Sequence, residues 1–166
     1  MDIEDPDDPR VVEALNDDTK IAKLIQITSG HVKNNDGVVV PLHEDRFKQL
    51  DAILEEVEEP IVVAFWFQAT LERLRERYKK YAVADARDLG AIDAFNRGDL
   101  RLLFAQPASV GHGIELQHGG RVLVNFDAYW SNDLYRQVIE RLGPLRQKRA
   151  GYYRAVYVYN IVAQDT

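Results

Sequence analysis

Apolar residues follow two different periods along this chain, and the alternation of the two predicts its helices and strands. In five stretches they recur every three to four positions, the spacing that places them on one face of a helix. In five others they form short, nearly continuous runs, which suit strands buried on both faces of a sheet. The predicted helices are residues 11–28 (with a break near residues 16–18), 46–57, 69–78, 89–95 and 133–142. The predicted strands are residues 61–67, 81–84, 100–106, 121–127 and 155–163.

Predicted strands and helices alternate at a spacing of roughly 20 to 25 residues, which is typical of βαβ units with helices on both faces of a mainly parallel sheet. We therefore expect an α/β three-layer sandwich, to which the two N-terminal helices add a further layer. Residues 31–40 contain an Asn-Asp-Gly sequence that predicts a hairpin or an irregular loop. Ser131 is expected to cap the last helix, and Gly143-Pro144 is expected to end it.

The composition describes one globular domain, with 166 residues of which 46% are apolar. Residues 1–10 are rich in aspartate and proline and are expected to form a flexible acidic tail, followed by one domain over residues 11–166. The absence of cysteine excludes disulfides, thiolate metal ligands and cysteine nucleophiles. No apolar run is long enough to cross a membrane, and the N-terminus has no signal-peptide pattern. We therefore expect a cytoplasmic protein with no membrane partner.

The net charge of −6 argues against a simple nucleic-acid coat protein, because neutralisation of phosphates usually requires a basic balance. The basic residues nevertheless gather in two segments, residues 73–80 and 146–154. The first segment has Glu76 among its basic residues and is typical of a solvated helix face. The second gives a local basic surface that is compatible with contacts to a DNA backbone.

The stretch most informative about function is residues 106–147, which begins with the small-residue sequence QPASVGHGIELQ, a loop expected to open into a short helix. Gly111 and Gly113 allow the backbone to approach a ligand closely or to adopt positive φ. Ser109 can donate its hydroxyl to a phosphate. His112 lies between the two glycines and is expected to be exposed rather than catalytic, because no second histidine or carboxylate stands at ligand spacing.

Further along the same stretch, Gln137 and Arg141 are four residues apart and so share one face of the predicted helix. Arg146 follows just past the end of that helix. Arginine suits anionic oxygens because its planar fork bonds two of them and stays charged. An arginine pair after a small-residue loop is how a nucleotide-hydrolysing enzyme completes its site from a second domain. Neither a GxxxxGK[ST] phosphate loop nor a DEAH-like acidic box occurs in the sequence.

Four consecutive segments resemble, in order, parts of the second RecA-like lobe of Swi/Snf-type superfamily-two ATPases. Residues 21–32 (IAKLIQITSGHV) are similar to the segment that precedes motif IV, and residues 61–67 (IVVAFWF) are similar to motif IV itself. Residues 94–117 are similar to motif V, and residues 122–147 to motif VI with the strand before it. The resemblance runs from Ile21 to Thr166. One position departs from it: Pro144 stands where the family has the second arginine of motif VI, and Arg146 is the next candidate. A Gly-Pro version is expected in shorter phage or bacterial members.

The resemblance implies the C-terminal motor lobe of a DNA-dependent ATPase that translocates on double-stranded DNA. Such a helicase C-terminal domain is expected to be inactive alone, because ATP and Mg²⁺ bind only when an N-terminal RecA-like lobe is present in cis or in trans. The chain is then part of a two-lobed protein, excised from it or encoded separately, and is expected to be a monomer in isolation. The residues implied are Arg141, Arg146 and Gln137 in catalysis, Gly111, Gly113 and Glu115 in ATP binding, and Ser109, Arg149 and Arg154 in DNA binding.

Several alternatives remain open from the sequence. Arg141 can instead pair with Glu140 or Asp133 at the surface, and Ser109 can be the N-cap of a short helix. The whole chain can be a non-catalytic RecA-like module that docks on DNA or protein, an interpretation that Pro144 favours. A third interpretation is an unrelated α/β enzyme in which residues 109–113 bind a small anion.

Overall fold

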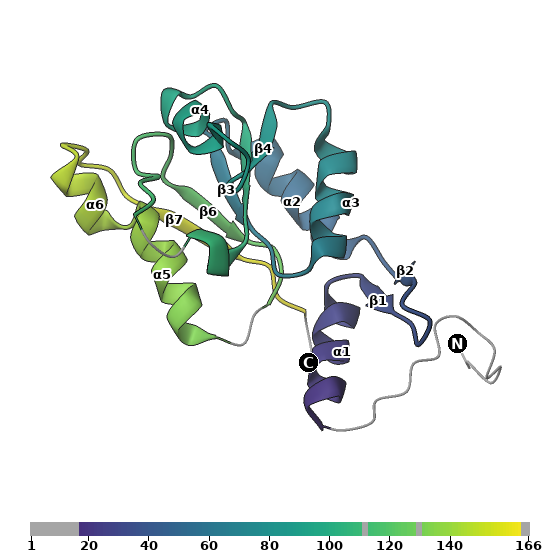
Figure 1. Cartoon of the computed structure of the whole chain (residues 1–166). Helices are drawn as coiled ribbons and strands as arrows, with labels where there is room; N and C mark the ends of the chain where they lie inside the picture. The colour runs from purple at the N-terminus through teal and green to yellow at the C-terminus, as the bar shows by residue number, and fades with distance from the viewer. Residues whose placement is uncertain (1–16, 111–112, 129–130, 164–166) are drawn as a thin grey trace.

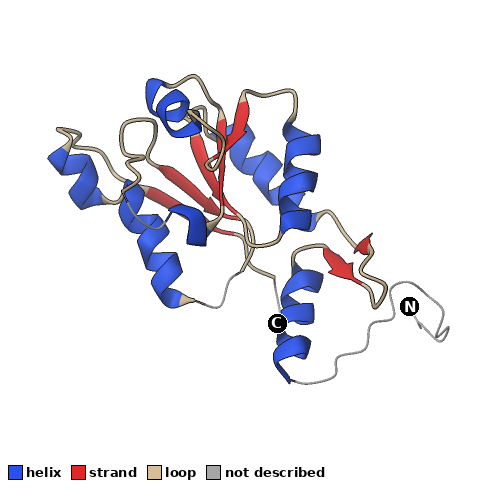
Figure 2. Ribbon diagram, viewed as in Figure 1, coloured by secondary structure: helices blue, strands red, loops and turns tan. Residues whose placement is uncertain are grey.

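The computed structural model describes residues 17–110, 113–128 and 131–163, in which a five-stranded parallel sheet lies between two layers of helices (Figure 1, Figure 2). All five predicted strands are present, and the predicted α/β class with a parallel sheet is confirmed. In spatial order the strands are β4 (Val83–Asp85), β5 (Leu102–Ala105), β3 (Ile61–Ala64), β6 (Val122–Asn125) and β7 (Tyr157–Asn160).

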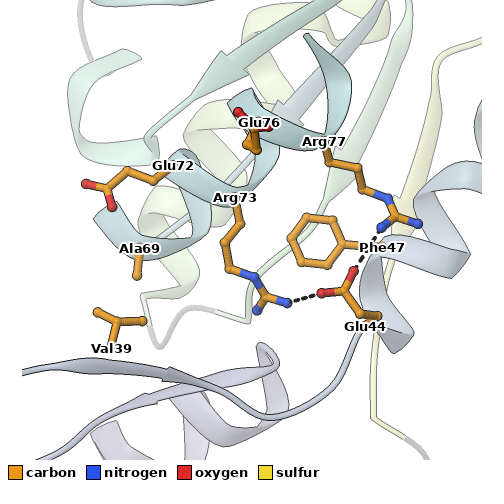
Figure 3. Close-up of a pocket in the computed structure, with 8 residues that line it drawn as sticks. All are labelled: Val39, Glu44, Phe47, Ala69, Glu72, Arg73, Glu76 and Arg77. Carbon is orange, nitrogen blue, oxygen red and sulfur yellow. Dashed lines mark hydrogen bonds and ion pairs between the residues drawn. The ribbon is translucent and has the colours of Figure 1, made fainter. Parts of the chain in front are cut away.

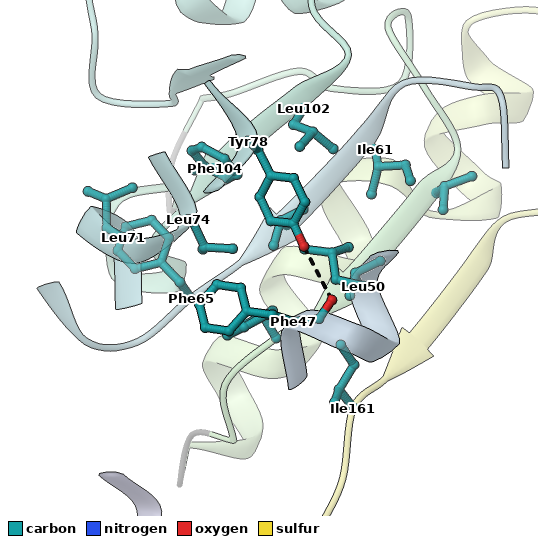
Figure 4. Close-up of a cluster of buried hydrophobic side chains, with 14 residues drawn as sticks. Phe47, Leu50, Ile61, Phe65, Leu71, Leu74, Tyr78, Leu102, Phe104 and Ile161 are labelled. Atoms are coloured by element: carbon teal, nitrogen blue, oxygen red, sulfur yellow. Dashed lines mark hydrogen bonds between the residues drawn. The ribbon is translucent and has the colours of Figure 1, made fainter. Parts of the chain in front are cut away.

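The three central strands are buried on both faces, as their continuous apolar runs predict. Alternate residues of these strands face opposite helix layers. On one face the odd-numbered residues of β3 pack against Phe47, Leu50 and Tyr78 (Figure 4). These side chains come from α2 (Asp45–Glu56) and α3 (Gln68–Tyr78). The other face is covered by α4 (Ala91–Arg97) and α5 (Asn132–Leu142).

Of the two N-terminal helices that were expected as an additional layer, α2 packs directly on the sheet beside α3. The other, α1 (Asp17–Thr28), stands to the side of the sheet with the antiparallel hairpin of β1 (His31–Lys33) and β2 (Val39–Pro41), as Figure 1 shows. The hairpin confirms one of the two alternatives for residues 31–40. The predicted tail, residues 1–10, lies outside the described residues.

All strands of the sheet are parallel and start in register. The sheet therefore has an amino edge, where the strands begin, and a carboxyl edge, where they end. Ile61 pairs with both Leu102 and Val122, and Val122 pairs with Tyr157. Loops that follow the strands therefore gather at the carboxyl edge, and loops that lead into them gather at the amino edge. The carboxyl edge carries the 3-10 helix η1 (Pro107–Val110).

Two local predictions about residues 106–149 need correction. The loop after β5 was expected to open into a short helix, but the described residues 113–116 are irregular, and the helical turn η1 comes before them. Gly143-Pro144 ends α5 as predicted, yet Pro144 also begins a second helix, α6 (Pro144–Arg149). Proline suits the first turn of a helix, where its missing N–H has no partner to lose. Arg146 therefore lies on a helix of its own.

One buried cation ties the carboxyl edge to the N-terminal elements. Arg46, at the start of α2, is 4% exposed. Its Nε donates to the carbonyl oxygen of Thr28 at 2.5 Å, and its Nη1 donates to the carbonyl oxygens of Phe126 and Ile161. Thr28 is the last residue of α1, Phe126 follows β6 and Ile161 follows β7. Burial lowers the pKa of Arg46, and the nearby carboxylate of Asp127 opposes that shift.

Replacing Arg46 by methionine should lower the free energy of unfolding by about 3–5 kcal/mol, because three buried carbonyl groups lose their donor. Urea denaturation of the two proteins measures this difference. As a control, Arg97→Met removes an arginine that pairs with Asp99 at the surface (2.8 Å) and should cost less than about 1 kcal/mol. Equal losses for the two variants would contradict the anchoring role of Arg46.

His31 predicts a specific dependence of stability on pH. Its side chain is 2% exposed, and burial lowers its pKa; the charge of Arg73 adds to this, and the carboxylate of Asp127 opposes it. Below a pH of about 6.5 the unfolded chain therefore binds a proton that the folded chain resists. The free energy of unfolding should fall as the pH drops from about 6.5 to 5 and should receive no contribution from His31 above that range.

Urea denaturation at several pH values between about 5 and 8 measures this slope. The variant His31→Phe keeps an aromatic ring against Phe67 and should lose the slope, whereas His118→Gln, at an exposed histidine, should retain it. A slope that survives in His31→Phe would assign the effect to another group.

Candidate functional site

The predicted catalytic residues on α5 lie beside the face of this helix that packs against the sheet. Ser131 caps this helix as predicted, and its side chain accepts a hydrogen bond from the N–H of Leu134 at 3.3 Å. Val138 and Leu142 fix the buried face of α5. Gln137 and Arg141 are therefore half-buried, one turn apart on the same side. The geometry expected for this pair on the helix is present.

Arg141 and Arg146 lie close enough to influence each other electrostatically, although they belong to different helices. Burial lowers the pKa of Arg141, and the positive charge of Arg146 lowers it further. Glu140, one of the two carboxylates considered as an alternative partner, has the smallest effect of the three on that pKa. Two neighbouring guanidinium groups repel each other unless an anion lies between them. The two positive charges therefore favour a ligand with several anionic oxygens on this side of the protein.

A cavity of about 330 Å³ lies between α6 and the segment that follows the glycine loop. Glu115 lies on one side of it, and Arg146 and Arg149 lie on the other. Gln117, His118 and Ala150 complete the lining. The fold thus joins residues of the motif V-like and motif VI-like segments, which are far apart in the sequence.

The segment 115–120 is held in place by α4, which the sequence analysis did not connect with the site. Asn96 donates from Nδ2 to the carbonyl oxygen of Glu115 at 2.7 Å, and its Oδ1 accepts from the N–H of Gly119 at 2.9 Å. A Cβ at Gly119 would overlap the carbonyl group of Phe95, and one at Gly120 would lie 2.8 Å from the carbonyl oxygen of Pro60. The adjacent glycines were the signal in the sequence that could have located this close approach.

Of the predicted ATP-binding glycines, Gly113 is exposed and has a φ of 76°, a conformation that favours glycine. A Cβ there would meet no neighbouring atom within 4 Å. Gly111, like His112, lies outside the described residues. The role of these glycines in binding a nucleotide remains a prediction.

The predicted DNA-binding residues do not lie together. Ser109 is in η1 at the carboxyl edge, and its hydroxyl donates to the carbonyl oxygen of Gln106 at 2.7 Å. It is inside this helical turn, so the alternative that made Ser109 an N-cap is wrong. Arg149 and Arg154 lie toward the opposite, amino edge, since they come shortly before β7. Ser109 and the two arginines would therefore touch different parts of a DNA molecule.

Arg154 is largely engaged by the protein itself. Its Nε donates to Oε1 of Gln147 at 2.8 Å, and its Nη2 donates to the carbonyl oxygen of Gln117 at 2.9 Å. The guanidinium also lies over the ring of Tyr152, 4.5 Å from the ring centre. These contacts give Arg154 a structural role that its basic surroundings in the sequence did not reveal. Arg149 is exposed and free of such internal contacts in the described part of the chain.

The other basic segment, residues 73–80, is a helix face whose charges are mostly paired. Figure 3 shows Arg73 and Arg77 directed to the same carboxylate, Glu44, at 2.5 and 2.9 Å. They line a separate cavity of about 550 Å³ between α3 and the hairpin, with Phe47 and Val39. Because its arginines already have carboxylate partners, this cavity is a poorer site for an anion than the one beside α6.

A metal site and a membrane span are both absent from the described residues. Within residues 17–110, 113–128 and 131–163, no group of three or more metal-ligating side chains is close enough to hold a metal ion. None of the helices in these ranges combines the length and the apolar character that crossing a membrane requires.

Comparison with known proteins supports the fold. No protein-family model matches the sequence. The chain is 41% identical over 157 residues to the putative protein p41 of Acyrthosiphon pisum secondary endosymbiont phage 1; this match covers 93% of the chain but spans only about a third (34%) of the length of p41.

Solved structures with a similar fold include the C-terminal part of the Fun30 ATPase domain, with 19% identity, a TM-score of 0.61, and coverage of 76% of this chain and 45% of that one. The yeast DEAD-box splicing factor Prp28 gives 22% identity, a TM-score of 0.57 and coverage of 74% and 28%. The C-terminal domain of the DEAD-box protein Dbp5 gives 16% identity, a TM-score of 0.54, and coverage of 74% of this chain and 72% of that one. The chain therefore has the same fold as these helicase C-terminal domains, and the predicted RecA-like fold class is confirmed.

Gly119→Ala should test the packing that places Glu115 in this site. The new methyl group would push the segment away from the backbone of α4, and we expect a loss of about 2–4 kcal/mol in the free energy of unfolding. Gly113→Ala, where space is open and only positive φ opposes the change, should cost about 1 kcal/mol. Chemical denaturation of both variants measures the difference, and a smaller loss for Gly119→Ala would contradict the close approach.

Proposed function

We propose that this chain is the C-terminal motor lobe of a Swi/Snf-type DNA-dependent ATPase that translocates on double-stranded DNA. The observation that carries the proposal is that Arg146 and Glu115 line one cavity of a RecA-like lobe, with Arg141 near enough for the charge of Arg146 to act on it. The ordered resemblance of residues 21–166 to motifs IV, V and VI of that family supports it. The lobe would act as a cytoplasmic monomer joined to its partner lobe.

In the proposed reaction, Arg141 and Arg146 neutralise the charge that develops on the γ-phosphoryl oxygens of ATP during hydrolysis. Their mutual repulsion is relieved when the triphosphate lies between them, so they favour the bound and reacting states. Gln137 would orient the arginines or the attacking water, and Glu115 would accept a hydrogen bond from a ribose hydroxyl. Gly111 and Gly113 would let the loop approach the nucleotide.

The phosphate cradle and the ligands of Mg²⁺ would come from a separate N-terminal lobe. In this cavity Arg146 and Arg149 suit phosphate oxygens, and Glu115 is a single carboxylate, too few oxygen ligands to hold Mg²⁺. Mg²⁺, held with ATP by the other lobe, would neutralise part of the phosphate charge. A two-lobed protein agrees with the greater length of p41, of which the chain spans about a third.

Contacts to DNA would come from both edges of the sheet. Ser109 would turn its hydroxyl from the carbonyl oxygen of Gln106 to a backbone phosphate at the carboxyl edge, and Arg149 would contact a phosphate from α6. Arg154 would contribute mainly by supporting α6, because its guanidinium is engaged by Gln147 and Gln117. This arrangement would track the backbone rather than read base sequence.

A second candidate is a non-catalytic RecA-like module that docks on DNA or protein. The observation that favours it is Pro144, which replaces an arginine expected in motif VI. In that case Arg141 and Arg146 would bind an anion without a catalytic effect.

The decisive experiment measures ATP hydrolysis by the two-lobed protein, with and without double-stranded DNA, for the wild type, Arg141→Ala and Arg146→Ala. We expect hydrolysis to be stimulated by DNA, and each substitution to lower kcat about 10³- to 10⁵-fold, the range measured for arginine fingers. Arg97→Ala serves as a control, because Arg97 is exposed and pairs with Asp99 at the end of α4 (2.8 Å); it should leave kcat unchanged.

The possible results separate the candidates. Loss of activity in Arg141→Ala alone would make Arg146 a DNA contact or a bystander. Full activity in both arginine variants would reject the motif VI assignment and support the non-catalytic module.

A further inference from the structure

Gln147 is a completely buried amide on an otherwise exposed, basic helix. Its relative exposure is 0%, whereas its neighbours Lys148 and Arg149 are exposed. Its Nε2 donates to the carbonyl oxygen of Gly120 at 2.9 Å, and its Oε1 accepts from Nε of Arg154 at 2.8 Å. A buried amide is favourable only when its donor and acceptor both have partners. The amide of Gln147 meets this condition, because its donor and its acceptor each have a partner.

The helix α6 depends on such an anchor for its position. It has six residues, far fewer than the roughly 12 to 15 that an isolated helix needs to be even marginally stable. Gly143 separates it from α5, so the helical register of α5 does not determine where Arg146 lies. Contacts made by α6 with the rest of the protein must therefore fix that arginine.

The partners of Gln147 are on the segment that leads into β6 and on the residues before β7. Gly120 ends the segment that Asn96 holds at Glu115 and Gly119. Arg154 binds the same segment at Gln117 and so doubles the connection. The amide of Gln147 thus links the residue next to Arg146 with the segment that carries Glu115, across the cavity that both residues line.

We infer that Gln147 is a positioning residue that fixes Arg146 relative to Glu115 and so sets the distance between the two sides of the nucleotide site. This inference rests on the proposed ATPase function. It assigns to Gln147 no contact with ATP; the amide acts through Arg146. Its removal should therefore change the rate of the chemical step more than the binding of ATP.

The test is a double-mutant cycle between Gln147→Met and Arg146→Ala, measured as DNA-stimulated ATP hydrolysis by the two-lobed protein. Methionine keeps the approximate volume and removes both hydrogen bonds. We expect Gln147→Met to lower kcat about 10- to 100-fold, as a small displacement of a catalytic group does, and to change KM for ATP less than about threefold. In the Arg146→Ala background the same change should have no further effect on kcat, because the residue that it positions is gone.

Two further variants separate positioning from loss of stability. Gln147→Glu keeps the acceptor for Arg154 but, when ionised, turns an oxygen toward the carbonyl oxygen of Gly120, so it should lower kcat as well. Leu50→Ala creates a cavity in the core under α2 and should lower the midpoint of urea denaturation. At a temperature where all the variants are folded, Leu50→Ala should leave kcat unchanged.

Any other result contradicts the positioning role of Gln147. The pattern of results also shows whether the proposed ATPase function is rejected. If Gln147→Met keeps the wild-type kcat, or lowers it equally with and without Arg146, the positioning role is rejected and the motor function stands. If Arg141→Ala abolishes hydrolysis but Arg146→Ala does not, the same conclusion follows. If the wild-type protein shows no DNA-stimulated hydrolysis, the proposed function is rejected together with the inference.

Discussion

The arrangement of this protein depends on the guanidinium of Arg46, which holds three chain segments at one point. The carbonyl groups of Thr28, Phe126 and Ile161 all need a donor, and no two of them belong to the same element. A nonpolar side chain could fill the space but could not satisfy these acceptors. The ends of β6 and β7, the end of α1 and the start of α2 are therefore fixed together, and the carboxyl edge of the sheet has a defined shape.

Asp127 extends this constraint to the central strand. Its Oδ2 accepts from the N–H groups of Trp66 and Phe67, at 2.8 and 3.3 Å, immediately after β3. The carboxylate also opposes the cost of burying Arg46. The loops at the carboxyl edge are thus braced by buried charges. At the amino edge, Arg101 and the Arg121–Glu59 ion pair act together with the neutral amides of Asn96 and Gln147. The candidate nucleotide site lies on the side that the amides support.

The strands could be predicted from the sequence because β3, β5 and β6 are apolar on both faces, and only a parallel sheet covered by helices buries such strands. The helix α6 could not be predicted, since Gly-Pro marks the end of a helix in a pattern and equally permits a proline to begin the next. The assignment of Arg154 to DNA came from its basic neighbours, and local charge says nothing about which acceptors the fold brings to a guanidinium. Asn96 was missed for a similar reason, because its two partners are 19 and 23 positions away.

The break between α5 and α6 affects how proteins of this kind can be recognised. When two arginines share one helix, the number of residues between them determines their separation, and a fixed sequence pattern can detect the pair. Here Arg141 and Arg146 belong to different helices, so the same separation in space is compatible with linkers of different length and composition. Relatives should therefore be compared by the three-dimensional placement of the two guanidinium groups, and insertions between α5 and α6 should be tolerated as long as that placement is kept.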